Sequence, residues 1–465
     1  MTLREVAAAT GGMVHGDADT MVHGLFTDTR KPVPGALFVA LRGPNFDAHD
    51  FIPSAAREGA VAALVEHPVG DDLPQVVVAD TRLALGRLAA AWRARWRGRL
   101  VALTGSNGKT TTKEMLAAIL RQDGVTLATR GNLNNDIGAP LMLAELNDDQ
   151  AYAVIEMGAS HPGEIAYLTM LARPDVAFVN NTGRAHLEGF GGKDGVIRAK
   201  GEIYAGLSEG RLQKESEMRS APVRTLGRGV AVINMDDEGA PLWLELNRGR
   251  PVLRFGMERG DVDVNGRWSS SERGVRLHLE TPGAETCVEL AVAGEHNARN
   301  ALAAASAALA LGLKLERVKA GLESFAGVPG RLQRKPGLRG CVLWDDSYNA
   351  NPDSLRAGIR AVTAQGGETW LVLGNMGELG PDSAALHAES GRLARELGVH
   401  RLYTLGDLAA EAARAFGAGA RSYTDIEALL ADLREAVSPG IHILIKGSRS
   451  SRMERVTQAM EETAC

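Results

Sequence analysis

The sequence LVALTGSNGKTTT combines the residue types that hold a phosphate chain. Gly105 and Gly108 let the backbone curl so that successive N–H groups point inward, and a helix beginning after them adds partial positive charge. Lys109 is expected to reach the terminal phosphates of a nucleotide, and the hydroxyl of Thr110 to ligate Mg²⁺. Leu103 stands where the usual GxxxxGK[ST] pattern has its first glycine, so the match is to the shortened form GxxGK[ST]. The predicted nucleotide site consists of Gly105, Ser106, Asn107, Gly108, Lys109, Thr110 and Thr111.

Strand-like and helix-like stretches alternate around this loop. The runs LVALTG, AYAVIEMG and DVAFVNNTG predict a mostly parallel, doubly wound sheet with ligands at the carboxyl ends of its strands. A second series follows the GVPGR turn and predicts a Rossmann-like α/β domain from CVLWDD, TWLVLGNMG, HRLYTLGD and IHILIKGS. Short strand-like runs mixed with turns predict a small α/β domain at the start. We therefore expect three domains, at residues 1–80, 81–327 and 328–465, in a chain of 465 residues.

The composition is that of a globular protein, with 45% hydrophobic and 23% charged residues. A net charge of −5 gives no reason to expect a nucleic-acid or membrane partner. The three cysteines, Cys287, Cys341 and Cys465, are scattered, which argues against a disulfide framework and suits a reducing cytosol. The most membrane-like run, Ala301 to Leu313, is too short to span a bilayer. We expect a cytoplasmic monomer that acts on small molecules.

Three further residues of the middle domain invite functional and structural interpretations. Glu156 ends the AYAVIE strand, where a sheet presents ligands, and could bind Mg²⁺ or be a surface acid. His186 follows the next strand, but a lone histidine is more often structural than a ligand. Lys200, taken alone, is a solvated lysine of a helix.

The last third of the chain offers a similar set. Asn297 precedes an alanine-rich helix and suits either helix capping or recognition of a base. Asp346 ends the CVLWDD strand, and Arg331 follows a Gly-Val-Pro-Gly turn, so that one could accept from hydroxyls and the other bind phosphate. Asn349 and Asn351 could form part of a substrate site or a plain Asn-Pro turn.

Eight segments carry a resemblance to the Mur ligase family, from about Phe26 to about Val456. They are TGSNGKTT, GNLNNDIGAP, EMGASHPGEI, NTGRAHLEGFG, AKGEI, GEHNARNALAA, DDSYNANPDSL and KGSRSSRMERV. GNLNNDIG and DSYNANP resemble the members that add a dipeptide. The resemblance implies an ATP-dependent amide ligase that adds D-alanyl-D-alanine to UDP-N-acetylmuramoyl-tripeptide through an acyl phosphate, releasing ADP and phosphate, in peptidoglycan synthesis.

The resemblance also assigns the residues of the site. It makes Lys109, Glu156, His186 and Lys200 catalytic. It also places Mg²⁺ on Thr110, Glu156, His186 and a carbamylated Lys200, since CO₂ turns that amine into an anion able to hold the ion. It makes Asn297 an adenine contact, and Arg331 and Asp346 nucleotide contacts from the C-terminal domain. The first domain would hold the UDP end of the substrate. The implied substrate residues are Asp28, Thr29, Arg30, Asn134, Asn135, Asn349 and Asn351.

A few features depart from the family pattern. GNMGELG stands where GDMGELG is expected, which puts the role of an acid at Asn375 in doubt, and Ala48 replaces the glycine of FDGH. The polar stretch at 207–229 is an insertion relative to the family, and we expect residues 212–225 of it to form a mobile appendage. Two other functions stay open. A sister amide ligase would use another amine, and a P-loop switch ATPase would hydrolyse ATP without forming an amide.

Overall fold

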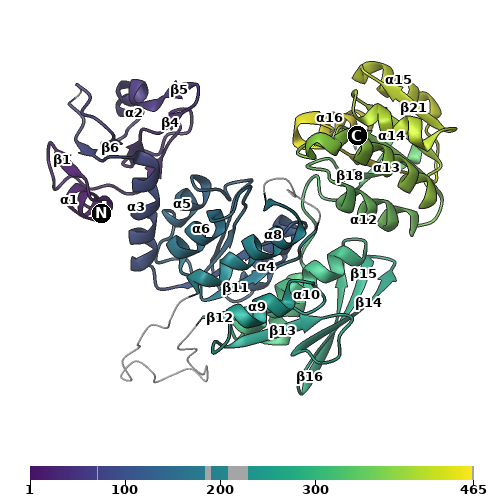
Figure 1. Ribbon diagram of the computed structural model, residues 1–465, viewed down its shortest axis with the longest axis horizontal. Coiled ribbons are helices and arrows are strands. Elements are labelled where there is room, and N and C mark those ends of the chain that lie inside the picture. Colours follow the sequence, from purple (N-terminus) through teal and green to yellow (C-terminus); the bar gives the residue numbers. More distant parts are fainter. Residues whose placement is uncertain (71, 184–189, 208–228, 463–465) are drawn as a thin grey trace.

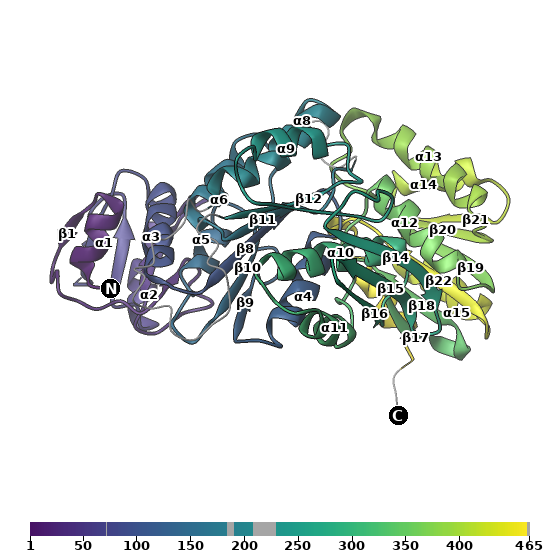
Figure 2. The ribbon, with the colours of Figure 1, turned by 90° about the horizontal axis from the view of Figure 1, so that it is seen from below.

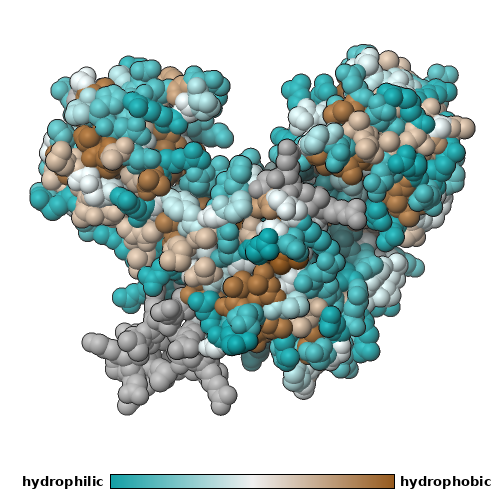
Figure 3. Space-filling view, viewed as in Figure 1, coloured by the Kyte–Doolittle hydropathy of each residue, from teal (hydrophilic) through white to brown (hydrophobic). Residues whose placement is uncertain are grey.

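The computed structural model describes residues 1–70, 72–183, 190–207 and 229–462. Three lobes follow one another along the chain, and the first and last project from the same side of the middle one (Figure 1). In the space-filling view they are separated by a V-shaped hollow (Figure 3). Within the described segments, no helix is long and apolar enough to cross a membrane. Of the sequence predictions, His186 and the segment 212–225 lie outside the described residues.

The N-terminal lobe is a small sheet with helices. Its strand order is β1-β7-β6-β3-β2, with β1 antiparallel to β7 and the other neighbours parallel. The expectation of a small α/β domain at the start of the chain is therefore confirmed. The elements are α1 (Leu3–Thr10), β1 (Met13–His15), β2 (Leu25–Phe26), β3 (Leu37–Val39), the hairpin β4 (Arg42–Gly43) and β5 (Phe46–Asp47), α2 (Ile52–Arg57), β6 (Ala62–Val65) and β7 (Gln75–Val77).

Helix α3 (Thr81–Arg95) joins this lobe to the next. Asp80 caps it, since the carboxylate accepts a hydrogen bond from the N–H of Leu83. Leu85 belongs to the apolar core of the N-terminal lobe, whereas Ala89, one turn on, belongs to the core of the central lobe. Helix α3 therefore contributes to the apolar cores of both lobes.

The central lobe contains a nine-stranded sheet in the order β16-β15-β14-β13-β12-β11-β8-β10-β9. Neighbours from β9 to β14 are parallel, as predicted, while β14, β15 and β16 form an antiparallel extension at one edge that the sequence analysis did not predict. The strands are β8 (Arg99–Thr104), β9 (Thr126–Ala128), β10 (Tyr152–Glu156), β11 (Val176–Val179), β12 (Val230–Asn234), β13 (Val252–Gly256), β14 (Val264–Ser271), β15 (Gly274–Thr281) and β16 (Ala284–Leu290).

Helices cover both faces of this sheet. One apolar core packs α4 (Lys109–Leu120), α10 (Glu295–Ala310) and α11 (Leu315–Glu323) on one face. A second core on the other face includes α5, α6, α8 and α9. These four helices are α5 (Gly138–Leu143), α6 (Glu164–Ala172), α8 (Lys193–Gly201) and α9 (Ala240–Leu246).

The C-terminal lobe has a six-stranded sheet in the order β17-β18-β22-β19-β20-β21, parallel except for β17. This confirms the Rossmann-like prediction, and Figure 2 shows the lobe beside the central sheet. The strands are β17 (Gln333–Pro336), β18 (Val342–Asp346), β19 (Glu368–Gly374), β20 (Arg401–Leu405), β21 (Ala420–Tyr423) and β22 (Ile441–Lys446). The helices are α12 (Pro352–Thr363), α13 (Ser383–Glu396), α14 (Ala409–Phe416), α15 (Ile426–Ala436) and α16 (Glu454–Met460).

Candidate active site

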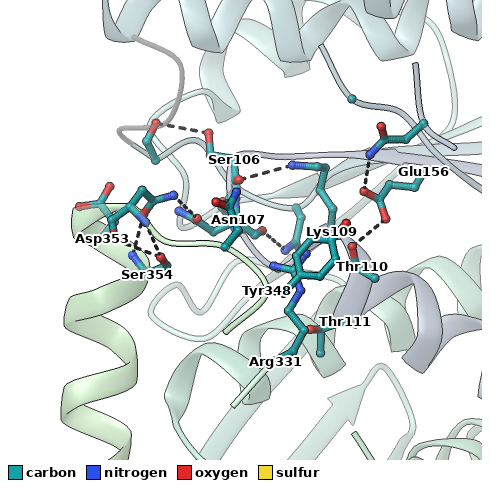
Figure 4. Close-up of a pocket in the computed structure, with 18 of the residues that line it drawn as sticks. Ser106, Asn107, Lys109, Thr110, Thr111, Glu156, Arg331, Tyr348, Asp353 and Ser354 are labelled. Carbon is teal, nitrogen blue, oxygen red and sulfur yellow. Dashed lines mark hydrogen bonds between the residues drawn. The ribbon is translucent and has the colours of Figure 1, made fainter. Parts of the chain in front are cut away.

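A cavity of about 830 Å³ lies between the central and C-terminal lobes, at the carboxyl ends of strands from both sheets. Figure 4 shows side chains from the two lobes that line it. Every predicted nucleotide residue lines the cavity apart from Gly105, which precedes Ser106 in the wall. The other predicted residues in its lining are Asn134, Asn135, Glu156, Lys200, Asn349 and Asn351. Residues separated by hundreds of positions are thus brought to one site.

The phosphate loop connects the end of β8 to the start of α4. Gly108 has a φ of 75° and precedes the helix, and a Cβ atom there would lie 2.3 Å from Asn300 Oδ1. Glycine is therefore required on two grounds, conformation and space. No side chain caps α4, so the first-turn N–H groups and the helix dipole are available to an anion in the cavity. This arrangement suits the phosphates of a nucleotide.

Asparagines hold the loop in this shape. Asn181 accepts a hydrogen bond from the N–H of Ser106 through its carbonyl and from the N–H of Asn107 through its side chain, each at 2.9 Å. Asn180 Nδ2 donates to the carbonyl of Asn107 and to Asn300 Oδ1, both at 2.9 Å. The sequence analysis did not single out Asn180 and Asn181, although they directly follow β11 at the ligand edge of the sheet. Their position after a buried strand was the available signal.

Lys109 lies against the loop that it belongs to. Its Nζ atom donates to the carbonyl of Gly105 at 2.7 Å and to that of Ser106 at 3.4 Å. Burial lowers the pKa of Lys109, while the negative charge of Glu156 raises it. A cation held at this place can bind the terminal phosphates of a nucleotide.

Glu156 is buried, with 2% of its surface exposed, so the alternative of a surface acid is wrong. One carboxylate oxygen accepts from Thr110 Oγ1 at 3.0 Å, and the other accepts from Asn134 Nδ2 at 2.8 Å. A carboxylate and a hydroxyl in contact beside the phosphate loop are hard oxygen donors of the kind that Mg²⁺ prefers. These residues fit the predicted metal site.

Lys200 is also buried, at 2% exposure, so the expectation of a solvated lysine is wrong. It lies on α8, and Nζ is 5.5 Å from the centroid of the Phe190 ring. Burial and, to a smaller extent, the charge of Lys109 lower the pKa of Lys200 to about 7. Within the described ranges, no three histidine, cysteine, aspartate or glutamate side chains gather as a metal cluster.

The wall contributed by the C-terminal lobe centres on a buried ion pair. Asp346 ends β18 and is opposite Lys446, which ends the neighbouring strand β22. Lys446 Nζ bonds to Asp346 Oδ2 and donates to the carbonyl of Asn349 at 3.0 Å, and Asp346 Oδ1 accepts from the N–H of Leu332 at 3.2 Å. Lys446 was not predicted from the sequence, although it ends a predicted strand as Asp346 does.

Aromatic stacking and one hydrogen bond complete this wall. The guanidinium of Arg331 lies 4.1 Å from the centroid of the Tyr348 ring. Asn351 accepts from the N–H of Ser354 at 2.8 Å and so caps α12, while its Nδ2 atom donates to Asn107 Oδ1 at 2.9 Å. The Asn-Pro turn is therefore confirmed, and the capping residue also contacts the phosphate loop, while the substrate role of Asn351 stays a prediction.

Asn297 does not precede the alanine-rich helix. Helix α10 begins at Glu295 with Gly294 at the capping position, so the alternative of a capping role for Asn297 is wrong. The side chain is 3% exposed and its Nδ2 atom donates to the carbonyl of Ala293 at 2.8 Å. Its Oδ1 atom accepts from Asn300 Nδ2 at 3.3 Å, which extends the asparagine network.

The predicted UDP-sugar residues lie in the N-terminal lobe and do not line this cavity. Arg30 forms a two-pronged pair with Asp28, with both N–O distances at 2.9 Å, and Thr29 lies between them in the chain. The Arg30 side chain is 87% exposed. Their role stays a prediction.

Asn375, which stands where an acid is expected, has a structural contact. Its Oδ1 atom accepts a hydrogen bond from the N–H of Ala409 at 2.8 Å, at the start of α14. An amide oxygen can make this bond as a carboxylate would. The substitution therefore keeps the contact without a charge.

A phosphate loop with a buried carboxylate, facing a Rossmann-like lobe across one cavity, defines a nucleotide-binding protein of the P-loop class. Comparison with known proteins is more specific. The Mur ligase middle domain matches residues 103–308, the Mur ligase glutamate ligase domain 330–449, and the Mur ligase family catalytic domain 21–93. The chain belongs to the Mur ligase family.

Individual relatives match over their full length. The chain is 43% identical to UDP-N-acetylmuramoyl-tripeptide--D-alanyl-D-alanine ligase of Escherichia coli, over 99% of this chain and 98% of the relative. It is 38% identical to the ligase of the same name from Haemophilus influenzae, over 96% and 95%. The crystal structure of MurF from Acinetobacter baumannii superposes with a TM-score of 0.88 at 37% identity, covering 98% of both chains. MurF ligase from Thermotoga maritima in complex with ADP gives 0.81 at 30% identity, covering 95% and 97%.

Proposed function

We propose that this chain uses ATP to join D-alanyl-D-alanine to UDP-N-acetylmuramoyl-tripeptide, which yields the pentapeptide precursor of peptidoglycan. The observation that carries the proposal is the single cavity in which the phosphate loop faces the DSYNANP segment of the other lobe. Relatives named for this reaction, similar over the full chain, support it. A switch ATPase would have no use for the wall made by Asp346, Lys446 and Asn349.

The reaction needs an activated acyl group, since an amine does not displace the oxygen of a free carboxylate. A carboxylate oxygen of the tripeptide attacks the γ-phosphorus of ATP, which forms an O–P bond and breaks the bond to ADP. The amine then attacks the acyl carbon, forms the C–N bond, loses a proton and expels phosphate. Each step is assisted mainly by positioning and by cations near the oxyanions.

Residues of the central and C-terminal lobes supply the positioning and the cations. The N–H groups at the start of α4 and the ammonium of Lys109 bind and neutralise the phosphates. Thr110 and Glu156 would hold Mg²⁺, which when bound neutralises charge on the phosphates. Asn297 would contact the base, and Arg331 and Asp346 would contact phosphate and ribose from the opposite wall. The UDP-linked tripeptide and the dipeptide would be contacted by Asn134, Asn135, Asn349 and Asn351.

We infer that Lys200 is carbamylated and joins the metal site. Only the neutral form of an amine attacks CO₂, and a buried environment favours that form. The amine of Lys200, with 2% exposure, therefore suits this modification. Attack forms an N–C bond and releases one proton, leaving a carboxylate-like anion. Burial favours the neutral amine by lowering the pKa of Lys200 to about 7.

Spectroscopy and rescue test the modification together. ¹³C NMR of enzyme equilibrated with ¹³CO₂ should show a carbamate signal that is absent from Lys200→Ala. That variant should be nearly inactive and partly restored by small carboxylates at high concentration. Intact activity in Lys200→Ala, or no carbamate signal in the parent, would contradict the inference.

We also infer that the protein works in the cytoplasm as a monomer. One chain supplies both walls of the cavity, and Cys287 and Cys341 are free thiols, which suits a reducing compartment. Analytical ultracentrifugation at the concentration used in activity assays should give the mass of one chain. A stable dimer would contradict the inferred monomeric state.

Substrate choice tests the function as a whole. With the UDP-linked tripeptide and D-alanyl-D-alanine, ADP and phosphate should be released in equal amounts with the amide product. L-alanyl-L-alanine should be rejected, since inversion misplaces the methyl or the carboxylate in a fitted site. Phosphate release without any dipeptide would favour a switch ATPase. Product formed from a single amino acid and a shorter UDP-linked precursor would favour a sister ligase.

A further inference from the structure

The loop that follows β19 enters the cavity and holds a glutamate in an unusual backbone conformation. Its residues Gly377, Glu378 and Leu379 line the cavity. Glu378 has a φ of 60°, in the left-handed region that residues with a Cβ rarely adopt. Such a conformation is kept only where the surrounding structure fixes it, and it occurs often at functional sites.

The surrounding structure does fix this loop. The buried ring of His387 accepts from the N–H of Met376 through Nε2 at 2.9 Å and bonds to the carbonyl of Ser383 through Nδ1 at 2.6 Å. The carbonyl of Asn375 accepts from the hydroxyls of Ser448 and Ser451, at 2.8 and 2.9 Å. The loop is therefore anchored on both sides of its backbone before it reaches Glu378, which is presented on a rigid support.

Glu378 lines the same cavity as the phosphate loop, but from the opposite wall. Glu156 belongs to the central lobe, whereas Glu378 comes from the C-terminal lobe. The two carboxylates therefore enter one cavity from opposite walls.

The incoming amine must reach the same region. It has to approach the acyl carbon to about 3–3.5 Å for attack, and that carbon carries the phosphoryl group just transferred. The α-amino group of a dipeptide is an ammonium ion at neutral pH. Lys109 and Arg331 also line the cavity and would repel it, so the approach needs a carboxylate on the C-terminal side.

We propose that the carboxylate of Glu378 binds the α-ammonium group of the incoming dipeptide and orients it beside the activated carboxyl group. This inference rests on the proposed ligase function and adds a residue that recognises the amine substrate. Two other carboxylates lie on this wall, Asp346, which is paired with Lys446, and Asp353, in the first turn of α12. Glu378 is favoured because it sits on the anchored, left-handed loop.

Steady-state kinetics of Glu378→Gln test the proposal. The substitution keeps the size of the side chain and removes its charge, so the KM for D-alanyl-D-alanine should rise about tenfold or more, as expected for loss of a charge-assisted hydrogen bond. The KM values for ATP and for the UDP-linked tripeptide should stay within about twofold of the parent. Glu389→Gln on α13 is the matched control, because Glu389 is exposed and does not line the cavity. It should leave all three constants unchanged.

An amine-free analogue separates recognition from a general structural effect. Propionyl-D-alanine has the shape of the dipeptide without its amino group, so its inhibition constant should be equal for the parent and Glu378→Gln. An unchanged KM for the dipeptide in Glu378→Gln would overturn the proposal. Equal weakening of the dipeptide and of propionyl-D-alanine would also overturn it, as would a selective effect found in Asp353→Asn instead.

Hydroxylamine distinguishes this proposal from the function on which it rests. In the absence of dipeptide, it traps an acyl phosphate as a hydroxamate. Parent and Glu378→Gln should form hydroxamate at similar rates, since Glu378 acts after activation. No hydroxamate from the parent would refute the acyl phosphate itself, whereas hydroxamate from both with unchanged dipeptide KM would refute only the role of Glu378.

Discussion

Each of the two walls of the cavity contains a buried lysine, and the two lysines differ in the groups that surround them. On the C-terminal wall, Lys446 is bonded to Asp346 and to the carbonyl of Asn349. On the central wall, Lys200 lies over the ring of Phe190, and no ion pair holds it in the part of the chain that the structure describes. Both side chains are 2% exposed. Lys446 is therefore held by an ion pair and a hydrogen bond, whereas Lys200 is buried against an aromatic ring.

The same contrast extends to the rest of the two walls. On the central wall, neutral amides hold the phosphate loop, and the N–H groups at the start of α4 stay available for an anion. The C-terminal wall is built from charged groups at the ends of β18 and β22 and from a strained loop.

The largest expected effect is on stability, from Lys446→Met. Removing the cation leaves Asp346 without its partner, and breaking a buried pair in this way costs about 3–5 kcal/mol. Chemical denaturation of the variant should show this loss. The double variant Lys446→Met, Asp346→Asn should recover a large part of it, because both charges are then absent. Equal stability of the parent and the single variant would show that the pair is not buried as described.

The central wall is tested by Lys109→Ala, whose main effect should be on nucleotide binding. Loss of a charge-assisted contact costs about 1.5–3 kcal/mol, which is about 10–150-fold in affinity. The affinity for ATP, measured by calorimetric titration, and the rate of ADP release should both fall by at least that factor. Near-normal ligation by Lys109→Ala would show that this loop is not the nucleotide site.

Lys200→Met should change stability in the opposite direction from Lys446→Met. In metal-free and CO₂-free solution the pKa of Lys200 is about 7 in the folded state, lowered by burial from 10.5. Between these two values the unfolded chain binds more protons, so folding stability rises with pH, by at most about 1.4 kcal/mol per pH unit. The slope should be smaller in Lys200→Met, and the variant should melt at a higher temperature than the parent at pH 7. A parent and a variant with parallel pH profiles would contradict burial of the amine.

The smallest expected effect concerns the bond that joins the two walls. Asn351→Ala removes the cap of α12, at about 1 kcal/mol, and also the contact with Asn107. Asp425 is a matched control because it caps α15 in the same lobe without lining the cavity. Both alanine variants should lose similar stability in denaturant titrations, but only Asn351→Ala should lose turnover. Equal turnover of the two variants would show that the link between the walls has no role in catalysis.

Much of the central wall could be predicted from the sequence because its residues are contiguous. The glycines, Lys109 and Thr110 lie within six positions, and Glu156 directly ends an apolar strand. The partner of Asp346 could not be found in this way. Asp346 and Lys446 become neighbours only through the pairing of β18 with β22, across 100 positions of sequence.

Burial was the property that local patterns predicted least well. The helix containing Lys200 reads KDGVIRAKG, and its charges suggested exposure, yet Lys200 packs toward the cavity. Asn297 looked like a helix cap because it precedes a run of alanines, but α10 begins two residues earlier. The antiparallel strands β14 to β16 were missed since they carry polar, alternating residues after a parallel sheet. In each case tertiary packing decided what the local residues left open.

Oxygen-18 transfer tests the central claim, that the cavity first phosphorylates the carboxylate and then exchanges phosphate for the amine. The UDP-linked tripeptide would be labelled with ¹⁸O in both oxygens of its reacting carboxylate and ligated to D-alanyl-D-alanine with unlabelled ATP. Mass spectrometry should find one ¹⁸O atom in each phosphate released and one in the new amide carbonyl. Unlabelled phosphate accompanying amide formation would contradict the account, because the bond between the carboxylate oxygen and phosphorus would not have formed.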